Sequence, residues 1–295
     1  MRLLLRCGRG GTAAIVPLFL VGVTSLAQPP LCGQFASGVS LVEVYATATD
    51  RTGQPVTGLT AADFHVAEDD TPQTITIFSA GEFPLSVVVA LDRSFSMAGE
   101  PLARAKEAAR AFVANLRPDD EVMVLAIGSD VQTITPPVPA SAAAATRWDA
   151  IDAWGTTPLY DATSRALEAV QTRRGRRALL LISDGIDRDS ETTATEIVDR
   201  ARKSDVLVYP VAIGHTRPPV FAELANVTGG RSFFVDDLER LPSTLAAIAR
   251  ELRFQYLLGY VPSHAAREVP EWRSIQVAVD QRDVRVRARD GYFTR

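Results

Sequence analysis

Cysteine is nearly absent from this chain, which has two, Cys7 and Cys32, among its 295 residues. Cys7 lies in an N-terminal segment that we expect to be removed, so Cys32 would remain alone in the mature chain. No intramolecular disulfide is therefore expected, and stability must come from the size of the hydrophobic core. The remaining chain is long enough to bury a substantial core and to form two domains.

Several signatures of common enzymes are also missing. The chain has no Gly-x-Ser-x-Gly sequence and no glycine-rich phosphate loop, two patterns that mark many hydrolases and phosphate-binding enzymes. Its three histidines, His65, His215 and His264, are scattered without metal-ligand spacing, although His215 follows a predicted strand. The formal net charge of −4 argues against nucleic acid as the default partner.

No long apolar run is present, and the longest N-terminal one has the features of an export signal. Residues 1–27 combine three early arginines with the apolar stretch Thr12–Leu26 and with small residues, Ser25 and Ala27, before a cut at Gln28. The stretch is short for a membrane span and contains a proline, so an uncleaved anchor is the less favoured alternative. Residues 28–38 are expected to be a linker. The mature protein would be periplasmic or extracellular, without a stable membrane span.

A predicted buried strand followed by three oxygen-bearing side chains is the central feature. Leu85–Leu91 is an unbroken apolar run rich in β-branched residues, as in a strand covered on both faces of a parallel sheet. Asp92, Ser94 and Ser96 follow at alternate positions, beyond the carboxyl end of the strand, where open α/β sheets bind ligands. One carboxylate and two hydroxyls are hard ligands that suit Mg²⁺ or Mn²⁺ rather than zinc or copper. The alternative is that Asp92 or Ser94 merely caps the next helix.

Strand and helix patterns alternate from Pro84 onward, which is typical of a doubly wound, mostly parallel α/β sheet. The later strands are expected at Glu121–Gly128, Val131–Thr135, Arg177–Ser183, Val206–Ile213 and Arg231–Val235. Helices are expected at Pro101–Leu116, Ala140–Ala153, Thr192–Lys203, Val220–Val227 and Leu238–Leu252. We assign this domain to residues 83–252.

Two later segments complete a known pattern. Trp154–Ala162 reads WGTTPLYDA, and a second apolar strand ends in Ser-Asp-Gly at Asp184. With the Asp-x-Ser-x-Ser segment, they resemble the three loops of a von Willebrand factor type A (VWA) domain. The metal-ion-dependent adhesion site of that family uses this motif, a threonine and an aspartate. The resemblance implies Thr157 and Asp184 as further ligands, Asp184 directly or through water. Thr156 replaces the family's usual second glycine and remains an alternative to Thr157.

The two ends of the chain are predicted to form a second module. Residues 39–82 contain strand patterns, and their D-x-x-G-x-P-V-x-G-L-T sequence is similar to a leader in exported bacterial proteins described as acidobacterial-type VWFA-related proteins. Residues 253–295 contain the strand patterns Phe254–Gly259, Ile275–Val279 and Val284–Ala288. Neither end has enough strands for a stable sheet alone, so we expect the two to pair into a small β-sandwich. Arg285 and Arg287 of the last pattern are expected on its solvent face.

The resemblance implies a binding protein rather than an enzyme. In the resembled family, the ion holds a carboxylate offered by a partner protein, so we expect metal-dependent protein binding or adhesion. A magnesium-dependent phosphotransferase or hydrolase is one alternative, but it needs a second carboxylate where this chain has Ser94, and commonly a lysine. Only Lys106 and Lys203 exist in the chain. The other alternative is a metal-free interaction module, because Phe95 takes a usually small position in the motif.

Overall fold

The computed structural model describes residues 41–81, 83–143, 145–264 and 269–294. The chain divides into two units, Met1–Gly38 and Val39–Arg295. The export signal and linker predicted within residues 1–38 lie outside the described residues. None of the helices in the described part of the chain has the length and apolar character needed to cross a membrane.

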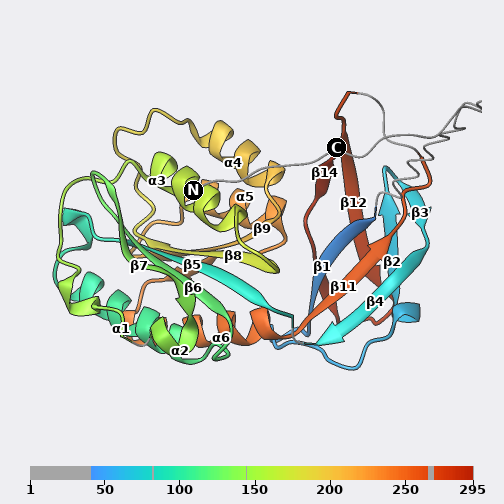
Figure 1. The fold of residues 1–295 in the computed structure, drawn as a ribbon, viewed down its shortest axis with the longest axis horizontal. Helices are drawn as coiled ribbons and strands as arrows, with labels where there is room; N and C mark the ends of the chain where they lie inside the picture. The colour runs from blue at the N-terminus through green and yellow to red at the C-terminus, as the bar shows by residue number, and fades with distance from the viewer. Residues whose placement is uncertain (1–40, 82, 144, 265–268, 295) are drawn as a thin grey trace, which may run out of the picture. The chain divides into compact units, whose positions relative to one another are not determined.

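A six-stranded sheet forms the α/β domain, with the strand order β10-β9-β8-β5-β6-β7 (Figure 1). Neighbouring strands pair in parallel except at the edge, where β7 runs antiparallel to β6. The strands are β5 (Leu85–Asp92), β6 (Glu121–Ile127), β7 (Val131–Pro139), β8 (Arg176–Ser183), β9 (Val206–Ile213) and β10 (Phe233–Val235). The predicted doubly wound, mostly parallel sheet is therefore confirmed.

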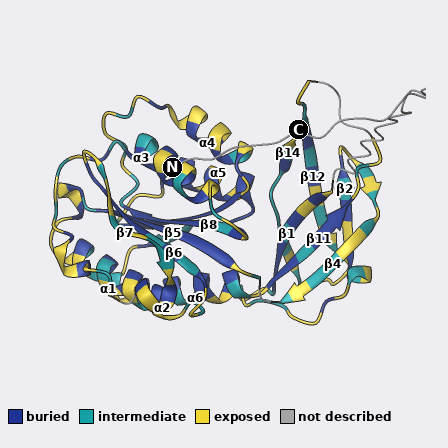
Figure 2. Ribbon diagram, viewed as in Figure 1, coloured by how far each residue is buried: buried dark blue, intermediate teal, exposed yellow. Residues whose placement is uncertain are grey.

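Helices cover both faces of this sheet, as Figure 1 shows. Alternate side chains of β5 enter two separate cores, one holding Val87 and Val89 and the other Val88 and Ala90. The first core lies under α1 (Glu100–Ala114), α2 (Ala140–Ala143) and α6 (Leu241–Arg253). The second lies under α3 (Leu159–Gln171), α4 (Ala194–Lys203) and α5 (Pro219–Thr228). Burial on both faces explains the continuous apolar composition of the central strands, which Figure 2 colours dark blue.

The predicted helix Ala140–Ala153 is wrong for most of its length. Helix α2 ends at Ala143, and a short 3-10 helix follows at Trp148–Ala150. Trp148 and Ile151 are buried in the first core, so the chain leaves the helical path to insert them. Burial of the tryptophan side chain contributes more to the free energy of folding than a longer helix of alanines would. β7 is also longer than the predicted Val131–Thr135, and its prolines are tolerated because it is an edge strand with register shifts.

Strands from both ends of the chain form two four-stranded antiparallel sheets, β13-β1-β11-β4 and β14-β12-β2-β3. The N-terminal strands are β1 (Val42–Thr49), β2 (Phe64–Glu68), β3 (Thr71–Gln73) and β4 (Ile75–Gly81). The C-terminal strands are β11 (Gln255–Tyr260), β12 (Trp272–Val279), β13 (Arg285–Arg287) and β14 (Gly291–Phe293). The sheets share one core. The predicted β-sandwich of N- and C-terminal segments is confirmed.

One expectation for the sandwich is only half right. Arg285 is exposed, as predicted, but Arg287 is half-buried and donates a hydrogen bond to Glu251 of α6. Glu251 is itself buried and also accepts from the Tyr209 hydroxyl at 2.9 Å. Arg287 therefore joins the sandwich to the α/β domain instead of facing solvent.

A buried carboxylate ties the two sheets of the sandwich together. Glu68 is 3% exposed and accepts hydrogen bonds from the hydroxyls of Tyr260 at 2.7 Å and Tyr292 at 2.9 Å. Arg273, 4% exposed, donates to the other oxygen of Glu68 at 3.0 Å. Burial and the bond to Glu68 raise the pKa of Tyr292 to about 12, so Tyr292 remains a hydroxyl donor at neutral pH. The network joins strands that lie about two hundred residues apart in sequence.

We predict that Arg273→Met destabilises the protein by about 3–5 kcal/mol, because it leaves the Glu68 carboxylate buried without its cation. The measurement is the free energy of urea unfolding. The control is Asp283→Asn, which breaks an ion pair with Arg51 between side chains that are 62% and 77% exposed. The control should cost less than about 1 kcal/mol. Equal losses in the two variants would contradict the assigned role of the network.

Candidate metal centre

Asp92 ends β5 at a position where its side chain is fully buried. The strand lies between β6 and β8, and Asp92 has 0% relative exposure. Within the described part of the chain, no arginine, lysine or histidine forms an ion pair with this carboxylate. Burial raises its pKa, against hydrogen bonds from Ser183, Ser94 and Thr157 that lower it. A carboxylate in such a place favours a cation beside it.

Hydrogen bonds connect four of the five predicted ligands, Asp92 and three hydroxyl-bearing residues, into one group. The Oδ1 of Asp92 accepts from the Ser94 backbone N–H at 2.8 Å and from the Thr157 hydroxyl at 3.0 Å. The hydroxyl oxygens of Ser94 and Ser96 are 3.0 Å apart. Asp92, Ser94 and Thr157 are buried, whereas Ser96 is exposed. The group therefore extends from the buried carboxyl end of β5 outward to solvent.

The structure distinguishes the two candidate threonines. Thr157 is 2% exposed and bonds to Asp92, while Thr156 is exposed and uses its backbone N–H to donate to the Ser129 hydroxyl at 3.0 Å. The preceding Gly155 has a φ of 77°, and a Cβ there would lie 2.3 Å from the Ser129 oxygen. Glycine is therefore required at position 155, whereas Thr156 has an ordinary negative φ.

Asp184 lies at the end of the neighbouring strand β8 but is not hydrogen-bonded to the other four in the described structure. It is half-buried, and its Oδ1 accepts from the Ile186 backbone N–H at 3.0 Å. The residue before it, Ser183, donates to Asp92 Oδ2 at 2.6 Å. Asp184 thus shares the sheet edge with the other candidates while its observed contact is to its own loop.

Ser183 also contacts the candidate site, although its sequence position did not single it out. Because β5 and β8 pair in parallel with Leu91 opposite Ile182, the next residues, Asp92 and Ser183, are also neighbours. Ser183 also accepts from the Gly185 backbone N–H at 2.9 Å, so it holds the third loop against Asp92. A polar residue at the end of the apolar run Ala178–Ile182 was the available signal.

Backbone hydrogen bonds fix the three loops to one another. The Phe95 N–H donates to the Gly155 carbonyl at 3.0 Å, and the Trp154 N–H donates to the Arg93 carbonyl at 2.7 Å, joining the first and second loops. The third loop joins the second where the Arg188 N–H donates to the Thr157 carbonyl at 2.8 Å. The candidate ligands are therefore held by connected loops on a rigid sheet.

Two acidic residues near the site have a supporting role. Asp161, in the first turn of α3, accepts from the backbone N–H groups of Thr192 at 3.0 Å and Glu191 at 2.9 Å, and the bonds from Thr192 and Glu191 lower its pKa. Asp187 accepts from the Tyr160 N–H at 3.1 Å at the start of the same helix. Both carboxylates fasten the third loop to α3.

The donor set fits a hard divalent cation. It comprises carboxylate and hydroxyl oxygens, the ligands that Mg²⁺ and Mn²⁺ prefer, and it lacks the sulfur and imidazole groups typical of zinc sites. The described residues contain no cluster of three or more His, Cys, Asp or Glu.

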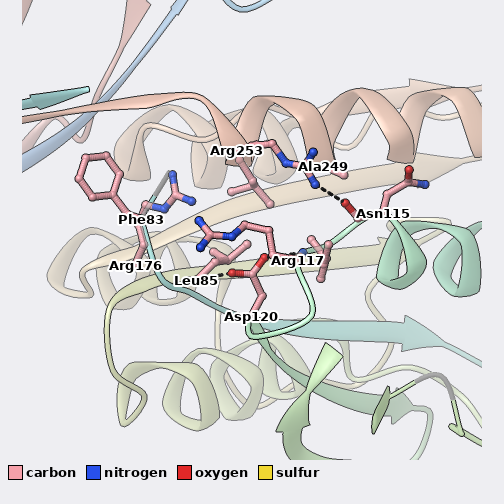
Figure 3. A pocket seen from close by; sticks show the side chains of 10 residues that line it. Phe83, Leu85, Asn115, Arg117, Asp120, Arg176, Ala249 and Arg253 are labelled. Carbon is pink, nitrogen blue, oxygen red and sulfur yellow. Dashed lines mark hydrogen bonds between the residues drawn. The ribbon is translucent and has the colours of Figure 1, made fainter. Parts of the chain in front are cut away.

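A separate pocket lies at the opposite end of the sheet (Figure 3). Its lining includes Leu85 and Arg176, the first residues of β5 and β8, whereas Asp92 and Ser183 end these strands. Burial lowers the pKa of Arg176 to about 10, and its guanidinium donates to Gln255 at 2.7 Å. The free volume is about 10 Å³, room for about one water molecule.

The fold and these loops define an α/β domain with an oxygen-rich group at the carboxyl ends of its strands. A scan against protein-family models matches residues 87–186 to the family described as von Willebrand factor type A domain. The match includes all five candidate ligands. The chain therefore contains a VWA domain.

Solved structures agree with this fold. A von Willebrand factor type A protein from Catenulispora acidiphila has 14% sequence identity, a TM-score of 0.51, and an alignment over 85% of this chain and 73% of that chain. Proximal thread matrix protein 1 from the mussel byssus, described with a zinc occupied MIDAS motif, has 13% identity and a TM-score of 0.52. Its alignment covers 62% of this chain and 50% of that chain. A search of the curated proteins finds no match.

We predict that Asp92→Asn stabilises the metal-free protein by about 1–2 kcal/mol at neutral pH. Because the pKa of Asp92 is raised in the folded state, its ionisation opposes folding as the pH rises through that pKa. The measurement is urea unfolding with a chelator present. Asp92→Ala should instead destabilise the fold, since it leaves the Ser94 N–H and the two hydroxyls without their acceptor. Equal destabilisation by Asn and Ala would contradict this assignment.

Proposed function

We propose that this protein binds Mg²⁺ or Mn²⁺ through Asp92, Ser94, Ser96, Thr157 and Asp184 and uses the ion to hold a protein partner. The observation that carries the proposal is the buried Asp92 carboxylate, which accepts hydrogen bonds from the hydroxyls of Thr157 and Ser183 and forms no ion pair with an arginine, lysine or histidine of the described structure. A bound divalent ion would supply the missing positive charge.

The residues at the site have different roles in binding the ion. In this proposal Asp92, Ser94, Ser96 and Thr157 offer oxygen directly, and Asp184 acts directly or through water. Ser183 orients the Asp92 carboxylate by donating to Oδ2. Mg²⁺ keeps part of its water shell in proteins, so a position remains for an oxygen from outside. A carboxylate of the partner suits that position because it adds a charge-assisted bond.

Two observations favour this function. Proximal thread matrix protein 1, which shares the fold, is described with a zinc occupied MIDAS motif, so the same architecture holds a divalent ion in that protein. VWA domains are generally interaction modules, and the lysines that a phosphotransferase commonly needs are engaged elsewhere. Lys106 donates to the Ile151 carbonyl at 3.0 Å, and Lys203 lies over the Phe293 ring. Binding is therefore favoured over catalysis.

Calorimetric titration of Mg²⁺ and Mn²⁺ into the metal-stripped protein tests the site. Wild type should bind one ion, and Asp92→Ala should abolish binding. Thr157→Val should weaken it by about ten- to hundredfold, a loss typical of disturbed metal shells. Thr156→Val is the matched control, because Thr156 is exposed and one residue away, and it should bind as wild type does. Absence of binding in wild type, or equal losses in both threonine variants, would overturn the assignment.

Export is the second part of the proposal, and it depends on residues 1–27. Their charged start, short apolar stretch and small residues before Gln28 favour removal on export to the periplasm or beyond. Mass spectrometry of the protein expressed with its full N-terminus in a bacterial host is expected to find a mature chain beginning at Gln28 outside the cytoplasm. Recovery of the uncut chain from the membrane would support the anchor instead.

A further inference from the structure

Each of the three candidate metal loops exposes one large apolar side chain. Phe95 is 65% exposed, Trp154 is 45% exposed and Ile186 is 40% exposed. Phe95 lies between Ser94 and Ser96, Trp154 lies three residues before Thr157, and Ile186 lies two residues after Asp184. We call these three residues the apolar collar. Among the described residues, six other large apolar side chains are exposed, all of them outside these three loops.

Backbone contacts hold the collar at the site. The N–H of Phe95 and that of Trp154 bond across the first two loops, and the Ile186 N–H donates to Asp184. In the same turn as Phe95, Met97 is buried at 1% exposure and anchors the loop in the core. The Arg93 guanidinium lies 5.2 Å from the centre of the Trp154 ring and supports it from one side. These side chains are therefore positioned outward by a fixed backbone.

The charges on these loops restrict the kind of partner that can bind at the collar. The third loop carries Asp184, Asp187 and Asp189 against Arg188, and Arg93 is already paired with Asp130 at 3.2 Å. Acidic side chains thus outnumber basic ones on these loops, which disfavours anionic lipid headgroups. The bound ion, with its double charge, would be the strongest attraction for a carboxylate, while further acids on the partner would be repelled by the carboxylates of the third loop.

We propose that the apolar collar selects a protein segment in which a single carboxylate is flanked by large apolar side chains. This inference rests on the proposed function, since the ion receives the carboxylate. Apolar side chains packed around the contact exclude water and strengthen the charged bond at its centre. Specificity then comes from the residues beside the carboxylate, because any protein acid satisfies the metal alone.

The test is selection of phage-displayed twelve-residue peptides, randomised around a fixed central aspartate, on the immobilised protein with Mn²⁺ or with chelator. Peptides that bind only with Mn²⁺ should be enriched in aromatic and large aliphatic residues near the aspartate and depleted in further acids. Synthetic copies should bind the Phe95→Ser/Ile186→Ser variant at least about tenfold more weakly than wild type. Mn²⁺ affinity should be unchanged in that variant.

Ile77→Ser is the matched control, because Ile77 is 41% exposed, nearly the same as Ile186, but lies on β4 of the sandwich. It should leave peptide binding unchanged. Metal-dependent peptides without apolar enrichment would overturn the collar alone, whereas absence of any metal-dependent selection would overturn the proposed function as well. Vesicles of anionic phospholipid form a parallel arm. Mn²⁺-dependent vesicle binding that is lost in the collar variant would replace the protein segment with a membrane surface.

Discussion

The burial of one carboxylate at the end of a central strand is the constraint on which this structure depends. Asp92 is fully buried because β5 lies in the middle of the sheet, and its two oxygens collect hydrogen bonds from three loops. Those bonds determine where Ser94, Thr157 and Ser183 lie. The same carboxylate is unfavourable in the metal-free fold and is the reason to expect a cation. Under the proposed function, the stability of the metal-free fold and the binding of the ion make opposite demands on this residue.

The sandwich combines the strands that precede the α/β domain with the strands that follow it. Strand β4 of the sandwich leads into β5, the first strand of the α/β domain. Helix α6, the last helix of that domain, leads directly into β11, which pairs with both β1 and β4. The joint lies at the opposite end of the sheet from Asp92, where Arg176 contacts Gln255 and Arg287 contacts Glu251. Within the described residues, no hydrogen bond or ion pair joins a candidate ligand to the sandwich.

Sequence patterns predicted the elements that are determined locally. The apolar run of β5, the periodic helices and the three loops were all recognisable, because burial on two faces and strand-end polarity leave clear signals. Predictions failed where tertiary packing decided the outcome. Trp148 leaves an alanine-rich segment to enter the core, and Arg287 turns toward a glutamate from another domain. The short strand β14 was also missed, since three residues carry too little periodicity to identify it.

Within the site, the sequence indicated the ligand candidates but not their support. Thr156 and Thr157 are adjacent and chemically identical, so they differ only in the burial and hydrogen-bond partners that the fold gives them. The contact of Ser183 with Asp92 depends on the register between β5 and β8, which no local pattern encodes. The acidobacterial-type family membership suggested by the N-terminal leader stays a prediction, since the family match begins at residue 87.

The most direct test of the metal centre is a crystal structure of the protein grown with Mn²⁺, with anomalous scattering used to locate the ion. We predict one strong peak among the oxygens of Asp92, Ser94, Ser96 and Thr157, with Asp184 bound directly or through water. A peak bound instead by Asp187 and Asp189, or no peak beside Asp92 at saturating Mn²⁺, would contradict the assignment. Only the first result would establish that the buried carboxylate exists to hold a cation.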